Sequence, residues 1–186
     1  MKYVVSLVLA AVILSGCGAG ATEMDRAICL RNALLQSRGC TFESVITADY
    51  GSKVYTFRMN CTLDENNTLT FVVLEPDTIA GISGKFASDG GKLIFDETVL
   101  AFPALTDGQL TPVSAPWILM NTLRAGYITA CGIDGDGLRI RINDSYETDA
   151  LTLDIYTDVN DIPVYGEILW KERRILSVDI RNFSFL

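Results

Sequence analysis

The sequence predicts an α+β fold: a strongly curved antiparallel sheet, close to half a barrel with about ten strands, wrapped around an N-terminal helix and a central buried helix. Three observations predict this class. Apolar and polar residues alternate through most of the chain, as in half-buried strands. Short polar turns separate the strands, which favours antiparallel neighbours. Two segments instead combine apolar stretches with helix-capping residues.

Residues 1–16 have the layout of a secretory signal peptide, in which Lys2 precedes a short apolar stretch. That stretch is too short to span a bilayer, which needs about 20 apolar residues. The sequence Leu14-Ser15-Gly16-Cys17 then matches the bacterial lipobox. We therefore expect cleavage before Cys17, acylation of that residue, and attachment to the extracytoplasmic face of the cell membrane, with residues 17–21 as the lipidated cysteine and a flexible tether. The alternative is an ordinary signal followed by a chance cysteine.

The first helix is expected over residues 22–38. Thr22 and Asp25 match a capping box, and Gly39 is a natural stop. The apolar residues of this helix form one stripe, interrupted by Arg31, and we expect the helix to cover the sheet. The stripe consists of Met24, Ala27, Ile28, Leu34 and Leu35.

Two strands are expected on either side of a turn centred between Tyr50 and Gly51. Their alternation is regular enough that a one-residue slip would turn the apolar side chains to the wrong face. This centre pairs the apolar residues Phe42 with Met59, and Ile46 with Tyr55.

The same register places Cys40 opposite Cys61 at a non-hydrogen-bonded position, where Cα atoms lie about 4.5 Å apart, within disulfide range. Because an exported chain can be oxidised, we predict a disulfide there, worth roughly 3 kcal/mol. The alternative is two buried free thiols.

Nothing in the sequence decides whether Cys29 and Cys131 pair. No metal is expected, since no CxxC pair is present and Asp134–Gly137 is better explained as a hairpin turn than as part of a calcium loop.

Eight further strands are expected, all joined by short turns. In the hairpin of residues 151–170, the apolar side chains suggest that Ile155 lies opposite Val164 and Leu151 opposite Ile168, with Asp154 on the other face. The expected strands are 69–73, 81–88, 92–95, 127–131, 138–143, 151–156, 164–170 and 175–183.

The central helix is expected over residues 114–125. It has Ser114 as its cap, Pro116 in its first turn and Gly126 as its stop. Because its middle is apolar on nearly all sides, it should be buried. Residues 103–112 before it are expected to form an irregular loop.

Composition narrows the class of function. After loss of Lys2 with the signal, 14 basic residues face 23 acidic ones, a net charge of −9, and no basic cluster is present. Nucleic-acid binding and electrostatic binding to anionic lipid are therefore not expected. The chain has no histidine, which removes the commonest general base and metal ligand. Because we also find no nucleophile–base pair and no phosphate-binding loop, we do not expect an enzyme.

The order helix, strands, central helix, strands makes residues 22–186 resemble a single domain of the bacterial lipoprotein-carrier superfamily. This superfamily includes LolA, LolB, RseB-type sensor domains and mycobacterial LppX-type lipoproteins. No diagnostic motif supports the likeness, so no functional residue is transferred from the family.

The resemblance implies an apolar ligand, such as a lipid, an acyl chain or a lipidated protein, held between the sheet and its helices, and no cofactor. The alternative is that the same side chains are plain core, and that the chain is an extracytoplasmic protein-interaction or sensor module. The candidate ligand-facing residues are Tyr55, Phe57, Met59, Phe71, Leu153 and Ile155 on the sheet, with Trp117 and Met120 on the central helix.

Overall fold

The computed structural model describes residues 22–49, 51, 53–95, 98–102, 105–106 and 109–186. The expected signal peptide, Cys17 and the tether lie outside these residues. Eleven strands form one antiparallel sheet in the order β6-β5-β4-β3-β2-β1-β13-β12-β11-β10-β9. The order is linear, so the sheet is open and ends at β6 and β9. Together with the two helices, it confirms the predicted α+β half-barrel.

The strands of the main sheet are β1 Gly39–Asp49, β2 Val54–Asp64, β3 Leu69–Glu75, β4 Ser83–Ala87, β5 Gly90–Phe95, β6 Thr98–Phe102, β9 Tyr127–Asp134, β10 Gly137–Asn143, β11 Leu151–Thr157, β12 Pro163–Trp170 and β13 Arg173–Phe185. The remaining elements are helix α2 Glu23–Gln36, the short strands β7 Leu105–Thr106 and β8 Gln109–Leu110, the 3-10 helix η1 Pro112–Ser114, and helix α3 Ala115–Ala125.

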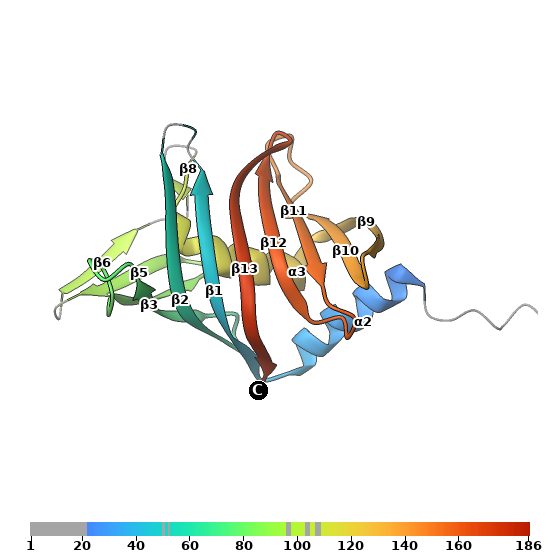
Figure 1. Cartoon of the computed structure of the whole chain (residues 1–186), viewed down its shortest axis with the longest axis horizontal. Coiled ribbons are helices and arrows are strands. Elements are labelled where there is room, and N and C mark those ends of the chain that lie inside the picture. The colour runs from blue at the N-terminus through green and yellow to red at the C-terminus, as the bar shows by residue number, and fades with distance from the viewer. Residues whose placement is uncertain (1–21, 50, 52, 96–97, 103–104, 107–108) are drawn as a thin grey trace, which may run out of the picture.

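Both helices lie on one face of the sheet, which we call the concave face. Figure 1 shows α3 running behind β1 and β13, across the middle of the sheet. Helix α2 lies below it and packs against β9, β10 and α3. One hydrophobic core, containing residues of both helices and of strands from both halves of the sheet, fills the space between these layers. The helices thus provide the cover that an apolar sheet face requires.

Helix α2 begins as predicted. The Asp25 backbone N–H donates to Thr22 Oγ1 at 3.2 Å, and the Thr22 N–H donates to Asp25 Oδ2 at 3.0 Å, which is a complete capping box. The helix ends at Gln36, and Ser37 is its C-cap. Gly39 is the first residue of β1, with a φ of 140° that favours glycine.

The predicted apolar stripe of α2 is wrong as a description of the buried face. The residues buried against the sheet are Ala27, Leu30 and Leu34, which follow a spacing of three and four. The other three members of the stripe point away from the core. They are Met24, Ile28 and Leu35, which are 38%, 43% and 48% exposed.

The central helix is buried as predicted, and Ser114 and Gly126 are its N-cap and C-cap residues. The Ser114 side chain makes no capping hydrogen bond to the helix; its hydroxyl donates to the carbonyl of Thr111 at 2.6 Å, within the preceding 3-10 turn. The expected irregular loop before it contains β7, β8 and η1, and β6 was not predicted.

Both predicted hairpin registers are wrong by two residues. In the first hairpin Phe42 pairs with Cys61 and Ile46 with Phe57. In the second, Ile155 pairs with Gly166 and Leu151 with Trp170. A shift of two leaves every side chain on its predicted face, because side chains alternate with a period of two. Hydrophobic alternation therefore cannot detect this error, which depends on the geometry of the turn.

The register also corrects the predicted disulfide. Cys40 pairs with Leu63, not with Cys61, and both thiols are free and buried. The Cys61 Sγ lies 3.4 Å from Ser44 Oγ. Burial raises the pKa of Cys40 and of Cys61 to about 12, so both thiols stay protonated near neutral pH.

A close approach between α3 and β12 sets the position of the central helix. A Cβ atom at Gly166 would lie 1.9 Å from Cδ1 of Leu119, a side chain that is fully buried. Only glycine allows the helix to lie this close to the strand.

We therefore expect Gly166→Ala to destabilise the protein by about 1–3 kcal/mol, because Leu119 would have to move within a packed core. Urea unfolding measures the loss. Leu119→Ala should be less destabilising in the Gly166→Ala background than in the wild type, since the two changes share one space. Gly132→Ala is the matched control, since its Cβ would meet nothing within 4 Å. Equal stability of the two alanine variants would contradict the packing described here.

Candidate functional site

The concave face is the candidate functional site, and the structure separates its eight predicted residues into three groups. Five lie in the hydrophobic core beneath or within α3. They are Met59, Met120, Leu153 and Ile155, each 0% exposed, and Phe71, 2% exposed. In this conformation a ligand cannot touch these side chains without displacing the helices.

Hydrogen bonds hold α3 against the turn between β2 and β3. The indole Nε1 of Trp117 donates to the carbonyl of Asn67 at 3.0 Å, and Asn67 Nδ2 donates to Asn121 Oδ1 at 2.6 Å. At the other end of α3, Arg124 donates to the carbonyls of Asp64 and Glu65, both at 3.2 Å. The covering helix is therefore fixed along its length.

Helix α2 adds a further contact. Nε of Arg31 donates to the carbonyl of Leu123 at 2.7 Å, near the C-terminal end of α3, where carbonyls lack helical partners. Trp117 is partly buried, and its ring stacks on Phe86 with centroids 6.5 Å apart. Of the two residues predicted on the helix, Met120 is thus core and Trp117 forms part of the helix attachment.

The remaining two predicted residues, Tyr55 and Phe57, lie near the start of β2. They belong to the same face of the strand as the buried Met59, but Tyr55 is 43% exposed and Phe57 is half-buried. Their rings stack, with centroids 6.4 Å apart. Their partners on β1, Ala48 and Ile46, are fully buried. We call Tyr55 and Phe57 the uncovered end of the concave face.

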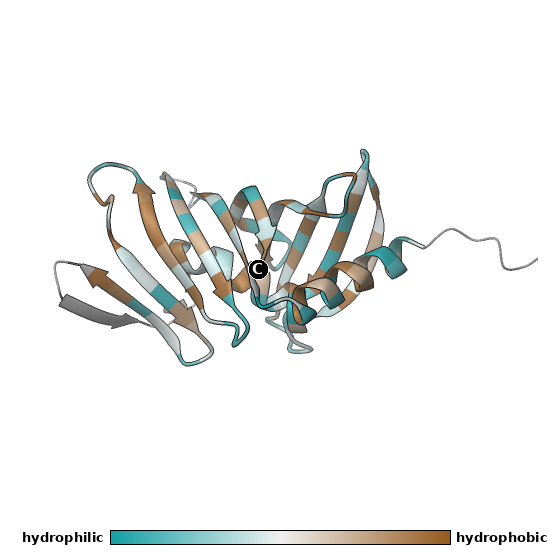
Figure 2. Cartoon of the chain, turned by 90° about the horizontal axis from the view of Figure 1, so that it is seen from below, coloured by the Kyte–Doolittle hydropathy of each residue, from teal (hydrophilic) through white to brown (hydrophobic). Residues whose placement is uncertain are grey.

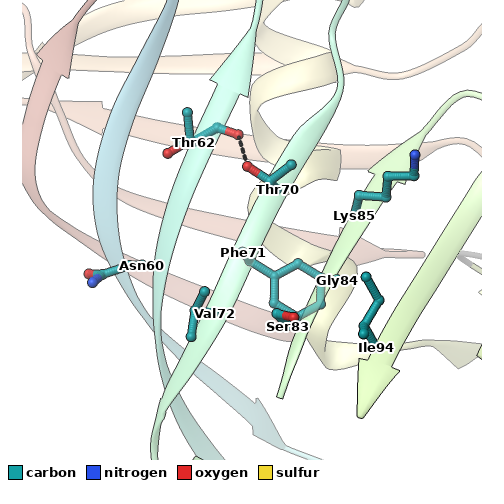
Figure 3. Close-up of a pocket in the computed structure, with 9 residues that line it drawn as sticks. All are labelled: Asn60, Thr62, Thr70, Phe71, Val72, Ser83, Gly84, Lys85 and Ile94. Atoms are coloured by element: carbon teal, nitrogen blue, oxygen red, sulfur yellow. Dashed lines mark hydrogen bonds between the residues drawn. The ribbon is translucent and has the colours of Figure 1, made fainter. Parts of the chain in front are cut away.

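Sequence reasoning missed a shallow groove on the opposite face of the sheet, with a volume of about 340 Å³. Figure 3 shows it crossing β2 to β5. Its apolar contacts are Val72 and Ile94, which are 43% and 44% exposed, and Lys85 supplies its cationic group. The remaining lining residues are Asn60, Thr62, Thr70, Phe71, Ser83 and Gly84. Phe71 belongs to the core and contributes only an edge of the groove. Strand alternation places polar residues such as Thr62 and Thr70 outside the core, but only cross-strand pairing brings them together.

The described residues show neither a metal-binding cluster nor a membrane-spanning helix. They contain no group of three or more His, Cys, Asp or Glu side chains that could hold a metal ion. Within the same residues, no helix is long and apolar enough to cross a membrane. The predicted residues of the concave face present apolar and aromatic side chains.

One buried carboxylate lies on the face opposite the helices. Asp154 on β11 is 0% exposed and accepts hydrogen bonds from Arg141 Nε and Nη2, at 2.8 and 2.7 Å, and from Arg139 Nη2 at 2.6 Å. Burial by itself would raise the pKa of Asp154, but the hydrogen bonds from Arg141 and Arg139 outweigh it, so that the pKa is lowered. This cluster ties β10 to β11 and has no access to the concave face.

No family model and no curated protein matches the sequence. The fold does match solved structures. A LolA superfamily protein from Nitrosomonas europaea aligns with a TM-score of 0.52 over 90% of this chain and 94% of its own, at 8% identity. A DUF1329 family protein from Desulfovibrio piger aligns with a TM-score of 0.50 over 88% and 91%, at 9% identity. The Mycobacterium tuberculosis lipoprotein LppX aligns with a lower TM-score of 0.41 over 87% of this chain and 91% of its own, at 10% identity. The chain thus has the fold of the superfamily that its element order resembles.

Asp154→Asn should lower the free energy of unfolding at pH 7 by about 1–2 kcal/mol, because both arginines lose an ionic acceptor while their partly exposed heads stay hydrated. A lowered carboxyl pKa contributes stability above the unfolded pKa of about 3.9, which is lost as the pH falls through the folded value. Urea unfolding at pH 7 and pH 3 should therefore show a smaller difference between variant and wild type at pH 3. Asp179→Asn, at an exposed position, is the control. An unchanged free energy of unfolding at pH 7 would show that the cost of desolvating the Asp154 carboxylate equals the stabilisation from its ion pairs with the two arginines.

Proposed function

We propose that this chain is a lipoprotein of the bacterial envelope, held at the extracytoplasmic face of the cell membrane by acyl chains on Cys17. We further propose that its LolA-type domain binds an apolar ligand, such as a lipid, an acyl chain or the lipid of another protein. The observation that supports ligand binding is the uncovered end of the concave face, where Tyr55 and Phe57 continue the apolar surface of β2 beyond the core.

The position of the proposed site follows from what covers the sheet. The centre of the concave face is occupied by α3, which Gly166 and the β2–β3 turn hold in place. A ligand can therefore contact the start of β2 without displacing α3. Aromatic rings suit this role, since they provide a large apolar surface at a low cost in side-chain entropy.

The second candidate function is a protein-interaction or sensor module with no lipid cargo. The complete burial of Met59, Met120, Leu153 and Ile155 favours it, because plain core residues account for most of the predicted ligand wall. The groove between β2 and β5 offers such a module a contact surface. Direct measurement of lipid binding separates the two functions.

For that measurement, we propose to titrate the domain from Ala21 with a fluorescent fatty acid and to search its organic extract for co-purified lipid by mass spectrometry. Saturable binding by the wild type is expected. Tyr55→Asp should weaken it at least about tenfold, equivalent to about 1.4 kcal/mol, because a charge would face the apolar ligand. Since Tyr55 is 43% exposed, urea unfolding should change little.

Tyr146→Asp is the control, since Tyr146 is 81% exposed and its ring also contacts a neighbouring aromatic ring, that of Tyr127. It should bind as the wild type does. Phe57→Asp answers a separate question, because loss of folding would identify this half-buried ring as core. Absence of saturable binding by the wild type would favour the interaction module. Equal binding by Tyr55→Asp and the wild type would refute the proposed position of the site.

The anchor has its own test. The full chain should fractionate with membranes, and its mature form should start at Cys17 with the added mass of acyl chains. Cys17→Ser should move the protein to the soluble fraction, because two or three chains, at about 0.8 kcal/mol per buried CH₂, supply the attachment. A mature N-terminus at another residue, or an unacylated Cys17, would contradict the proposed anchor.

A further inference from the structure

Helix α2 has an apolar line that neither the sheet nor α3 covers. Met24, Ile28 and Leu35 are 38%, 43% and 48% exposed. Residues separated by four and by eleven positions share one side of an α-helix, so the three side chains lie on one side of α2, and we call them the α2 stripe. Arg31 interrupts this stripe between Ile28 and Leu35, and its Nε donates to the carbonyl of Leu123 on α3. Single exposed apolar residues are ordinary on protein surfaces, but a line of three along a helix of 14 residues is an amphipathic pattern.

The α2 stripe lies at one end of the molecule. In Figure 1, α2 and the C-terminus are both at the bottom, and Figure 2 shows α2 from that side. The Arg38 N–H donates to the carbonyl of Leu186 at 3.3 Å, so the last residue adjoins the C-terminal end of the helix. Leu186 is 56% exposed. The end of β1 and the start of β2, which carries the uncovered end, lie at the top of Figure 1.

The length of the tether limits how far α2 can lie from a membrane. Cys17 precedes Thr22 by five residues. Five residues span at most about 18 Å when fully extended. The helix of 14 residues is itself about 21 Å long. An acyl anchor on Cys17 therefore keeps the start of α2, and with it Met24, within about one helix length of the bilayer surface.

We propose that the α2 stripe rests in the interface of the membrane that holds the lipid anchor, with α2 parallel to the surface. This inference depends on the proposed acylation of Cys17. The first turn carries Glu23 and Asp25, and the mature chain is acidic, so attraction to anionic lipid contributes nothing. Burial of apolar side chains adds to the attachment that the acyl chains on Cys17 supply. This orientation points the uncovered end of the concave face away from that membrane.

Hydroxyl-radical footprinting with mass spectrometry tests the contact on the full chain. Lipidated protein in vesicles of phosphatidylethanolamine and phosphatidylglycerol is compared with the Cys17→Ser protein mixed with the same vesicles. Oxidation of Met24, Ile28 and Leu35 should be at least about threefold slower in the lipidated protein, because the interface excludes water from them. Val72 and Ile94, at 43% and 44% exposure on the opposite face of the sheet, are the matched internal controls and should not change.

Several outcomes would overturn the inference. A lipidated protein with an unprotected α2 stripe would refute the membrane contact while leaving the anchor intact. Protection that appears without vesicles and rises with protein concentration would assign the stripe to a second copy of the chain. An intact mass without acyl chains, measured before footprinting, would refute the anchor and this inference together.

A variant pair provides a second measurement. The double variant Ile28→Gln, Leu35→Gln should transfer from donor to acceptor vesicles at least about fivefold faster than the wild type, since apolar burial is lost. Val72→Gln, Ile94→Gln is the matched control, with similar exposure and the same type of change. Both pairs lie at exposed positions, so circular dichroism should show the native fold. Equal transfer of the two variants would refute the contact.

Discussion

An open, curved sheet with one apolar face requires a cover, and in this protein the cover depends on the close contact between α3 and β12. The helix approaches the strand where Gly166 has no side chain, and Leu119 occupies the space. Close packing then leaves little volume between the layers. The position of α3 decides which parts of the concave face are core and which remain open, so it also decides where a ligand can bind.

This arrangement differs from a hollow whose walls are all accessible. Met59, Leu153 and Ile155 are fully buried, while Tyr55 on the same face of the sheet is 43% exposed. The change from accessible surface to core therefore occurs within β2, between Tyr55 and Met59. The hydrogen bonds from Trp117 and Arg124 to the β2–β3 turn stabilise this boundary, since moving the helix would leave those donors and carbonyls without partners.

Helix α2 has two apolar sides, of which one is buried against the sheet and the other is exposed to solvent. One side packs against the sheet through Ala27, Leu30 and Leu34, and the neighbouring side carries Met24 and Ile28 into solvent. An exposed apolar line on a helix favours association with other molecules unless a partner or a membrane covers it. Its place after a short tether gives the N-terminal segment and the first helix one physical role in our proposal, which is to hold and orient the domain.

The sequence by itself determined the fold class, the faces of most strands, the capping box of α2 and the burial of α3. These features depend on local chemistry: alternation with a period of two, the Thr22 and Asp25 side chains, and a helix that is apolar on nearly all sides. Only the tertiary structure decided the hairpin registers, because Cys40 faces the same side of the sheet whether it pairs with Cys61 or with Leu63. It also decided which apolar line of α2 is buried and which aromatic residues stay accessible. Those outcomes depend on how closely the helices approach the sheet, which is a property of packing between distant segments.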